Sequence, residues 1–543
     1  MIVPPSAAPG GWYRWYVLFV MMLVYAFNYI DRQIITILAP YLKADLRITD
    51  AQLGLLFGTA FALFYGLFGI PLARLADGWS RVKTLAIGLS FWSGMTALSG
   101  FSSNFGQLGI ARIGVGVGEA SATPAAVSLL GDYFDRRIRG TVLALYSVGV
   151  YIGAGLSLMI GGSVVVAWTN AFGSAETAPF GLAGWQVAFI AVGVPGLLLA
   201  LIVLLTIREP GRGALEGKVE PNDPAPFRSA LRELTRMFPP WSLARLSKPG
   251  IARVEFNRNL TWLLCTIVAV ALATLLSNAV LTEARRPVLA APFGLAITTN
   301  HVQWIAMGIA AYASASWFQS VRLRDPAAAR MITRSSTYRA VILAGASLAF
   351  AMNAVNGFIF VYANRYLGLG AEIGLSFGAI AIIAGASGII VSGDLSDRAK
   401  ARHPGGRLYL ACVTTVLFTI ASLIQFTTSD VTAFFVAYAC ATFFVPMWFG
   451  PLQATTQDLV TPRLRGTAFA VFSLGPNIIG LGLGPYTVGL ISDVSGSLRT
   501  GIIVAICIVP VSLFALLFAA QRLAAAEAAV FARGDDVDAD VET

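Results

Sequence analysis

Long apolar runs, separated by short polar segments, follow one another along most of this chain. Several reach or exceed the length of about 20 residues that a helix needs to cross a bilayer. Six such runs lie in the first part of the chain, at 15–42, 52–76, 84–103, 106–134, 140–167 and 186–207. Six more lie at 339–367, 372–396, 407–426, 432–458, 466–492 and 500–521. The pattern predicts an all-α polytopic membrane protein. The alternating segments of about ten residues that mark β-barrel strands are not seen.

The distribution of charge supports this prediction and orients the chain. Only 12% of the residues are charged, whereas an ordinary soluble domain has about 25%. The net charge is +10, but Lys and Arg gather in the short loops after the second, fourth, eighth and tenth runs. This placement follows the positive-inside rule, so we expect no nucleic-acid partner and both termini in the cytoplasm. The compact loops favour a bacterial cytoplasmic membrane.

The two sets of six runs are related to each other in sequence. The segment 51–58 (AQLGLLFG) resembles 371–378 (AEIGLSFG), and Asp132 recurs as Asp458, each followed by an Arg-x-Arg-Gly-Thr motif. Parallel duplication of six-helix halves is typical of a large class of transporters that bind substrate near the midplane between the halves. The repeat therefore predicts two pseudo-symmetric six-helix halves.

The remaining segments complete a predicted domain plan. The predicted parts are an N-terminal half at 1–207, a cytoplasmic linker at 208–259, an extra apolar hairpin at 260–322, a C-terminal half at 323–522 and a disordered acidic tail at 523–543. An inserted hairpin would give fourteen spans, and the alternative is that one or both of its helices pack laterally without crossing. Within the linker, 227–238 has the pattern of an amphipathic helix lying on the membrane.

Four ionisable residues lie inside the predicted spans of the first half: Asp31, Arg32, Arg112 and Glu119. Such residues cost about 2.5–3.5 kcal/mol each on insertion scales and tend to persist where they have a function. Because an arginine cannot release its proton, we hypothesise that Asp31 and Glu119 carry protons. Arg32 and Arg112 would tune them or hold an anionic headgroup. The alternatives are a static charge cluster that fixes helix packing, and snorkelling of Asp31 and Arg32 to the interface.

The second half has Asn356 at the position that corresponds to Asp31, so the buried charge is confined to the first half. We expect neutral and aromatic side chains to complete a cavity. The candidates are Tyr65, Tyr151, Asn353, Asn356, Trp448 and Gln453.

Two short motifs resemble catalytic or nucleotide-binding patterns, but the secondary structure around them does not match those patterns. The segment 374–378 fits the nucleophile-elbow pattern GxSxG, which needs a strand–turn–helix setting and a histidine partner. Its counterpart in the first half has Leu56 in place of the serine. The glycines of 114–118 follow no strand, so they do not predict a nucleotide site. We therefore expect neither an enzyme nor a metal or cofactor site.

The loop 73–83 (ARLADGWSRVK) resembles the signature between helices two and three of the major facilitator superfamily, and 393–398 (GDLSDR) resembles it more closely. The segments 28–32 (NYIDR), 112–121 (RIGVGVGEAS) and 131–134 (GDYF) together resemble the spinster family. Animal members of that family export phosphorylated sphingosine or lysophospholipids. The organic-anion:cation symporters share an Asp-Arg pair in helix one and an Arg and Glu in helix four.

The resemblance implies a proton-coupled secondary transporter that moves an amphipathic anionic lipid, of the sphingolipid or lysophospholipid class, by alternating access. One alternative is a symporter of polar organic anions such as sugar acids or aromatic acids, and another is a non-transporting membrane sensor. The implied partners are a proton, the small substrate and membrane lipids, and we expect a monomer. The resemblance also implies cytoplasmic gate contacts at Asp77, Arg81, Asp132, Asp397, Arg398 and Asp458.

Overall fold

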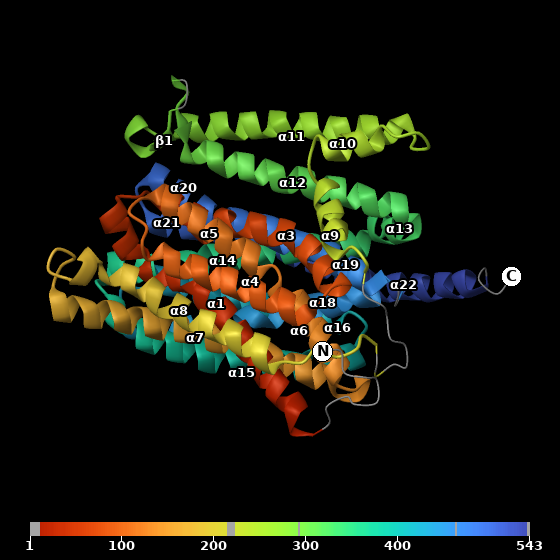
Figure 1. Cartoon of the computed structure of the whole chain (residues 1–543), viewed down its shortest axis with the longest axis horizontal. Helices are drawn as coiled ribbons and strands as arrows, with labels where there is room; N and C mark the ends of the chain where they lie inside the picture. The colour runs from red at the N-terminus through yellow and green to blue at the C-terminus, as the bar shows by residue number, and fades with distance from the viewer. Residues whose placement is uncertain (1–10, 214, 216–222, 292–293, 462–463, 540–543) are drawn as a thin grey trace. The chain divides into compact units, whose positions relative to one another are not determined.

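The computed structural model describes residues 11–213, 215, 223–291, 294–461 and 464–539, and nearly all of them are helical (Figure 1). The helices of the first half are α1 (Trp12–Leu46), α2 (Asp50–Phe57), α3 (Thr59–Gly78), α4 (Arg81–Ser99), α5 (Phe105–Glu119), α6 (Ala122–Tyr133), α7 (Arg136–Phe172) and α8 (Gly184–Thr206). Those of the second half are α14 (Ser336–Leu367), α15 (Gly374–Arg402), α16 (Gly406–Thr427), α17 (Val431–Phe444), α18 (Phe449–Asp458), α19 (Arg465–Gly475), the π-helical segment η8 (Pro476–Leu483), α20 (Gly484–Ser495), α21 (Leu498–Ile506) and α22 (Val509–Ala539).

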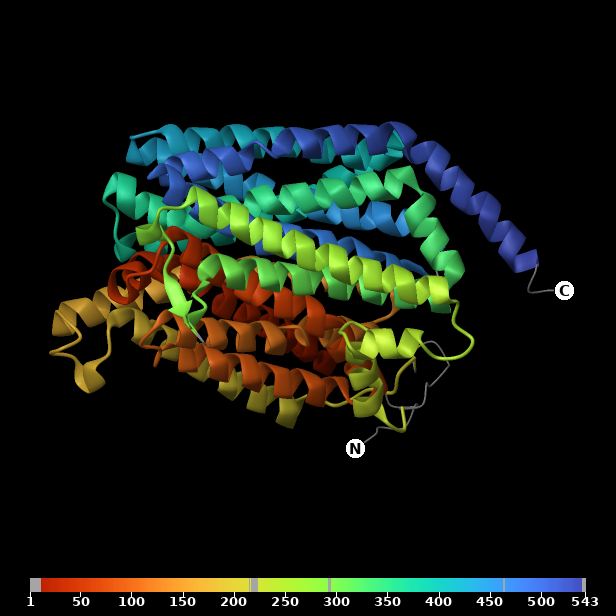
Figure 2. The ribbon, with the colours of Figure 1, turned by 90° about the horizontal axis from the view of Figure 1, so that it is seen from above.

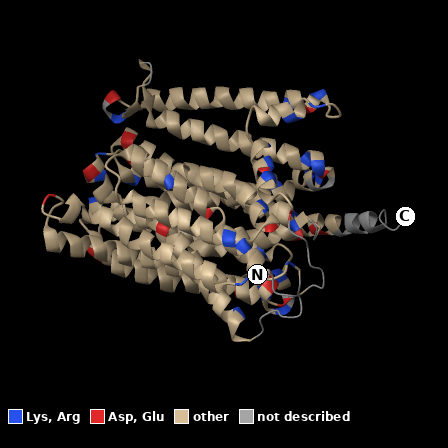
Figure 3. Ribbon diagram, in the orientation of Figure 1, with Lys and Arg blue, Asp and Glu red and all other residues tan. Residues whose placement is uncertain are grey.

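Each predicted span coincides with one helix or with consecutive helices, so the all-α prediction is confirmed. In the described part of the chain, twelve helical stretches are long and apolar enough to cross a membrane. Charged residues concentrate toward the ends of the helices and are sparse along them (Figure 3). Such a distribution is what a hydrocarbon layer requires, because a charge at its centre is costly.

Two helices, α11 (Arg253–Val280) and α12 (Thr299–Arg324), occupy the region of the predicted extra hairpin. They run side by side in opposite directions (Figures 1 and 2) and are joined through a two-stranded antiparallel sheet, β1 (Val288–Ala290) and β2 (Ile297–Thr298). Asn259 donates to Gln319 at 2.7 Å across the pair, and interhelical hydrogen bonds of this kind hold membrane helices together. Of these two helices, only α11 is both long enough and apolar enough to cross a membrane. The prediction that both helices span the membrane is therefore not supported.

The described residues form two compact units whose limits differ from the predicted halves. Unit 1 comprises 1–48, 60–250 and 363–382, and unit 2 comprises 49–59, 251–362 and 383–543. The predicted span 52–76 is divided between them, because Gly58 leaves the helical conformation between α2 and α3 (φ −110°, ψ −84°).

Within unit 2, α2 packs closely against α20. A Cβ atom on Gly54 would lie 2.5 Å from the carbonyl oxygen of Pro485, so only glycine permits this approach. The carboxylate of Asp493 on α20 accepts hydrogen bonds from the backbone N–H groups of Asp50 (3.2 Å) and Ala51 (2.8 Å). An anionic group at these unpaired N–H groups stabilises the start of α2.

The linker contains a helix where one was expected. The amphipathic helix predicted at 227–238 is present as α9 (Pro226–Thr235), and a second short helix, α10 (Trp241–Leu246), follows it. The consecutive prolines at 239 and 240 prevent a helix from continuing between them. The prediction of disorder from 523 onward is wrong for the described residues, because α22 continues to Ala539. This segment is rich in alanine, which has the highest helix propensity. Residues 540–543 and 216–222 lie outside the described part.

Candidate functional site

Asp31 lies at mid-length in α1 and is fully buried within unit 1. The hydroxyl of Ser93 on α4 donates to its Oδ2 atom at 3.3 Å. Its Oδ1 atom has no hydrogen-bond partner, and no cationic side chain of the described residues lies within 4 Å of the carboxyl group. The Asp31 carboxyl therefore contacts a serine hydroxyl and forms no ion pair, although the guanidinium group of Arg112 lies nearby on the backbone carbonyl of the same residue.

Arg32 points to a different helix from its neighbour, as the 100° step between adjacent helical residues requires. Its Nη2 and Nε atoms donate to Oε2 of Glu119 on α5, at 2.9 and 3.3 Å. The Glu119 side chain is fully buried and that of Arg32 is 16% exposed. The second oxygen of Glu119 has no hydrogen-bond partner. The pair is thus a membrane-embedded ion pair with one free acceptor.

Three aromatic rings surround the guanidinium group of Arg32. Its Cζ atom lies 4.9 Å from the ring centre of Tyr29, 4.4 Å from Phe61 and 4.9 Å from Tyr65. Each such contact contributes about 0.5–2 kcal/mol. These three side chains, called the aromatic cluster below, place ring faces beside the Arg32 charge and supplement its ion pair with Glu119.

Arg112 on α5 contacts the backbone of α1 rather than a carboxylate. It is fully buried, and it donates to the carbonyl oxygens of Asp31 at 2.9 Å and of Arg32 at 3.2 Å. These two bonds fix the segment of α1 that carries both functional candidates. Arg112 thus holds the backbone of α1 at residues 31 and 32, and an anion-binding role for either arginine stays a prediction.

Comparison with known proteins identifies the family. Residues 21–485 match the model of the Major Facilitator Superfamily. The chain belongs to this superfamily. Its transporters are not enzymes, in agreement with the sequence prediction. The match extends from within the first predicted span into the eleventh, and the fold expected from the internal repeat, that of the major facilitator superfamily, is confirmed.

Relatives within the superfamily include members of the spinster family. An MFS-type efflux pump of Mycolicibacterium smegmatis is 26% identical over 88% of this chain and 84% of that protein. Protein spinster of Drosophila melanogaster is 29% identical over 40% of this chain and 33% of that protein. The crystal structure of a bacterial homologue of the human lysosomal transporter spinster, inward-facing and unoccupied, superposes with a TM-score of 0.68. It is 23% identical and covers 95% of this chain and 99% of that one. This likeness shows the fold.

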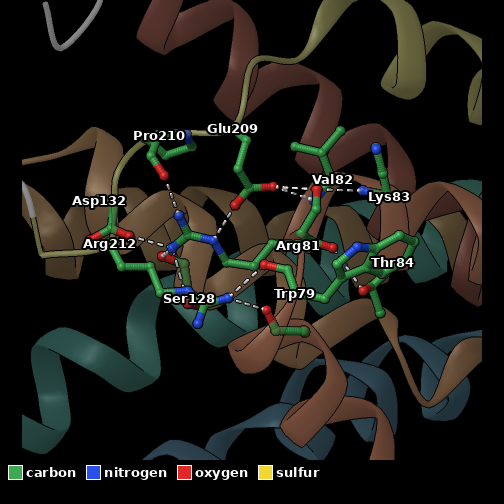
Figure 4. Close-up of polar contacts among 12 residues, drawn as sticks. Trp79, Arg81, Val82, Lys83, Thr84, Ser128, Asp132, Glu209, Pro210 and Arg212 are labelled. Atoms are coloured by element: carbon green, nitrogen blue, oxygen red, sulfur yellow. Dashed lines mark hydrogen bonds and ion pairs between the residues drawn. The ribbon is translucent and has the colours of Figure 1, made fainter. Parts of the chain in front are cut away.

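Two of the predicted gate residues of the first half, Arg81 at the start of α4 and Asp132 on α6, lie together (Figure 4). Arg81 forms an ion pair with Asp132, binds Oε1 of Glu209 through Nε at 2.8 Å and donates to the carbonyl oxygen of Pro210 at 2.8 Å. Asp132 and Glu209 contribute carboxylates that bind Arg81. Asp77 lies exposed near the end of α3. Glu209 was not predicted, although its position directly after a predicted span was a usable signal.

In the second half, the two predicted acidic gate residues are bound by Arg407, which was not predicted, and not by Arg398. Arg407 binds Asp458 at 2.8 Å and Asp397 at 3.1 Å. The predicted base, Arg398, instead pairs with Asp394 one turn earlier on its own helix, at 2.9 Å. Arg407 therefore joins Asp397 and Asp458, and a gate role for Arg398 stays a prediction. The helical repeat of 3.6 residues directs Arg398 toward Asp394 and away from Asp397.

Of the four predicted cavity residues in unit 2, two make a side-chain contact with another residue of the protein. The Asn353 side chain donates to the carbonyl oxygen of Ala349 on its own helix at 2.7 Å. The Trp448 indole contacts the sulfur of Met352 at 2.6 Å and is buried.

Asn356 and Gln453 are partly exposed, and neither side chain makes a hydrogen bond in the described part of the chain. In unit 1, Tyr65 belongs to the aromatic cluster. Tyr151 on α7 is partly exposed. A role in substrate contact stays a prediction for all six predicted cavity residues.

The structure adds residues that the sequence did not reveal. Phe61 and Tyr29 complete the aromatic cluster, and Ser93 is the hydroxyl beside Asp31. Ser93 belongs to a row of buried hydroxyls at 93, 96 and 99 along α4. Because these residues recur every three positions inside an apolar span, they could have identified this face of α4 from the sequence.

Proposed function

We propose that this chain is a proton-coupled secondary transporter of an amphipathic anionic lipid, of the sphingolipid or lysophospholipid class. The observation that carries the proposal is the separation of two functions on adjacent residues of α1. Asp31 is buried without a cationic partner, whereas Arg32 forms an ion pair that an anionic substrate can replace.

Asp31 is assigned the transported proton. A buried carboxylate without a counter-ion is costly when ionised, by several kcal/mol even after relaxation. Protonation removes this charge, and the adjacent hydroxyl of Ser93 can donate to the carboxylate or accept from the carboxylic acid. Asp31 can therefore hold or release a proton as the exposure of α1 changes during alternating access.

Arg32 is assigned the headgroup of the substrate. A phosphate or carboxylate can accept from its planar donors in the manner that Glu119 does now. Displacement would leave Glu119 buried without its cation, which favours uptake of a second proton. The partly exposed ring of Tyr65 lies beside the headgroup site and can contact an apolar part of the substrate.

The resemblance to the spinster family supports the lipid class. Purified full-length protein in proteoliposomes should catalyse counterflow of a labelled lysophospholipid or phosphorylated sphingosine, and an imposed proton gradient should drive its accumulation. Counterflow of a sugar acid but not of either lipid would reverse the assignment to the polar-anion alternative. Binding of lipid with no counterflow would instead indicate a sensor.

A further inference from the structure

The exposed face of α9 carries large apolar residues, which a helix facing water normally buries. Phe227 and Leu231, one turn apart, are each 59% exposed, and Arg228 and Arg232 are exposed beside them. Glu233, in contrast, is buried and forms an ion pair with Arg236. A helix on a water-facing surface normally buries its large apolar residues and exposes its acids. This face, 227–232, therefore presents an apolar strip directly beside a basic one.

Contacts with the end of α3 place α9 at the level of the membrane surface. The N–H group of Asp223 donates to the carbonyl oxygen of Gly78 at 2.9 Å, and Gly78 is the last residue of a membrane span. The ring of Phe227 lies 5.1 Å from that of Trp79. Tryptophan beside a span end is characteristic of the bilayer interface. The face 227–232 thus lies where lipid headgroups meet acyl chains.

The two arginines of this face are available for a ligand. In the described part of the chain, neither Arg228 nor Arg232 forms an ion pair, although the Asp223 carboxylate is near enough to interact with Arg232 through space. Guanidinium groups pair with phosphate through two parallel hydrogen bonds, and basic residues near an anionic leaflet attract its lipids. The adjacent Phe227 and Leu231 match the acyl chains of the same molecule.

We propose that the face 227–232 of α9 is a binding site for an anionic phospholipid of the membrane. Arg228 and Arg232 hold the phosphodiester, and Phe227 and Leu231 contact the acyl chains. The site is separate from Asp31 and Arg32. It adjoins the loop that leads from Gly78 into Arg81, so lipid bound there would hold the linker against that loop.

Native mass spectrometry of the full-length protein in detergent, titrated with phosphatidylglycerol, tests the proposal. The variant R228Q/R232Q should weaken retention of this lipid about 25-fold, since each arginine near an anionic surface accounts for a factor of about five. R228K/R232K keeps the charges and should retain most of the affinity. F227Q/L231Q should weaken binding of phosphatidylglycerol but leave binding of glycerol phosphate unchanged.

Two controls distinguish a lipid site on this face from a general effect of positive charge. R253Q/R402Q removes two exposed arginines elsewhere and should bind phosphatidylglycerol as the wild type does. Titration with phosphatidylcholine should show no difference between wild type and R228Q/R232Q. The proposal is overturned if R228Q/R232Q retains phosphatidylglycerol at wild-type affinity. It is also overturned if inorganic phosphate displaces the lipid at equal concentration, because the site would then bind a free anion.

Discussion

The ion pair between Arg32 and Glu119 can be tested as an energetic unit. Glu119→Gln keeps the size of the side chain and one acceptor but removes the charge. Arg32→Met keeps much of the apolar length and removes the donors. The two single variants and the double variant form a thermodynamic cycle, which isolates the interaction between the two side chains.

The expected magnitudes follow from the geometry. Removing one partner of a buried ion pair leaves an uncompensated charge and costs about 3–5 kcal/mol. Glu119→Gln should fall at the lower end, about 3 kcal/mol, because the aromatic cluster and slight exposure still stabilise the Arg32 charge. Two charge-assisted contacts at 2.9 and 3.3 Å predict a coupling energy of about 2–3 kcal/mol.

Equilibrium unfolding in mixed micelles, with increasing sodium dodecyl sulfate, measures these free energies. The double variant should be more stable than the sum of the two single losses predicts, by the coupling energy. A coupling below about 0.5 kcal/mol, the usual limit of additivity for independent sites, would show that the pair contributes no net interaction and would refute this reasoning.

Two further substitutions test the packing and the gate cluster. Gly54→Ala should lower the unfolding free energy by about 1–3 kcal/mol, because the added methyl group overlaps the backbone of Pro485. Gly66→Ala is its control, since a Cβ there meets nothing within 4 Å. Arg81→Lys should cost about 2–3 kcal/mol, because lysine cannot bridge the two carboxylates and the carbonyl that the planar guanidinium reaches. Arg402→Lys, at an exposed position, should be neutral.

Thermal denaturation of purified protein in detergent measures both effects. If Gly54→Ala is as stable as Gly66→Ala, the close approach of α2 and α20 is not a constraint on stability. If Arg81→Lys unfolds at the same temperature as the wild type, the planar guanidinium group of Arg81 contributes nothing to stability beyond its charge.

Much of the fold could be predicted because a membrane span can be recognised from the composition of its own segment. Runs of about 20 apolar residues and their basic flanking loops identify helices without knowledge of long-range contacts. The internal repeat, such as Asp132 with Asp458, then fixed the two halves. The break at Gly58 could not be predicted in the same way. It depends on how α2 packs against α20, more than 400 positions away in sequence.

The site was predicted in part for a related reason. Asp31, Arg32, Arg112 and Glu119 stand out as charges in apolar surroundings, and the structure brings all four together in unit 1. Their partners were not evident from the sequence. Arg112 binds backbone carbonyls, which have no sequence signature. The ring of Phe61 beside Arg32 is indistinguishable in sequence from a residue that only packs against lipid.

The central claim is that Asp31 carries the transported proton, and Asp31→Asn tests it most directly. Asparagine keeps the size and a hydrogen-bond acceptor for Ser93 but cannot titrate. In proteoliposomes supplied with labelled lysophospholipid outside, the variant should retain counterflow against unlabelled lipid inside and should lose accumulation driven by an imposed proton gradient. Gradient-driven accumulation at the wild-type level and with the wild-type pH dependence would contradict the account.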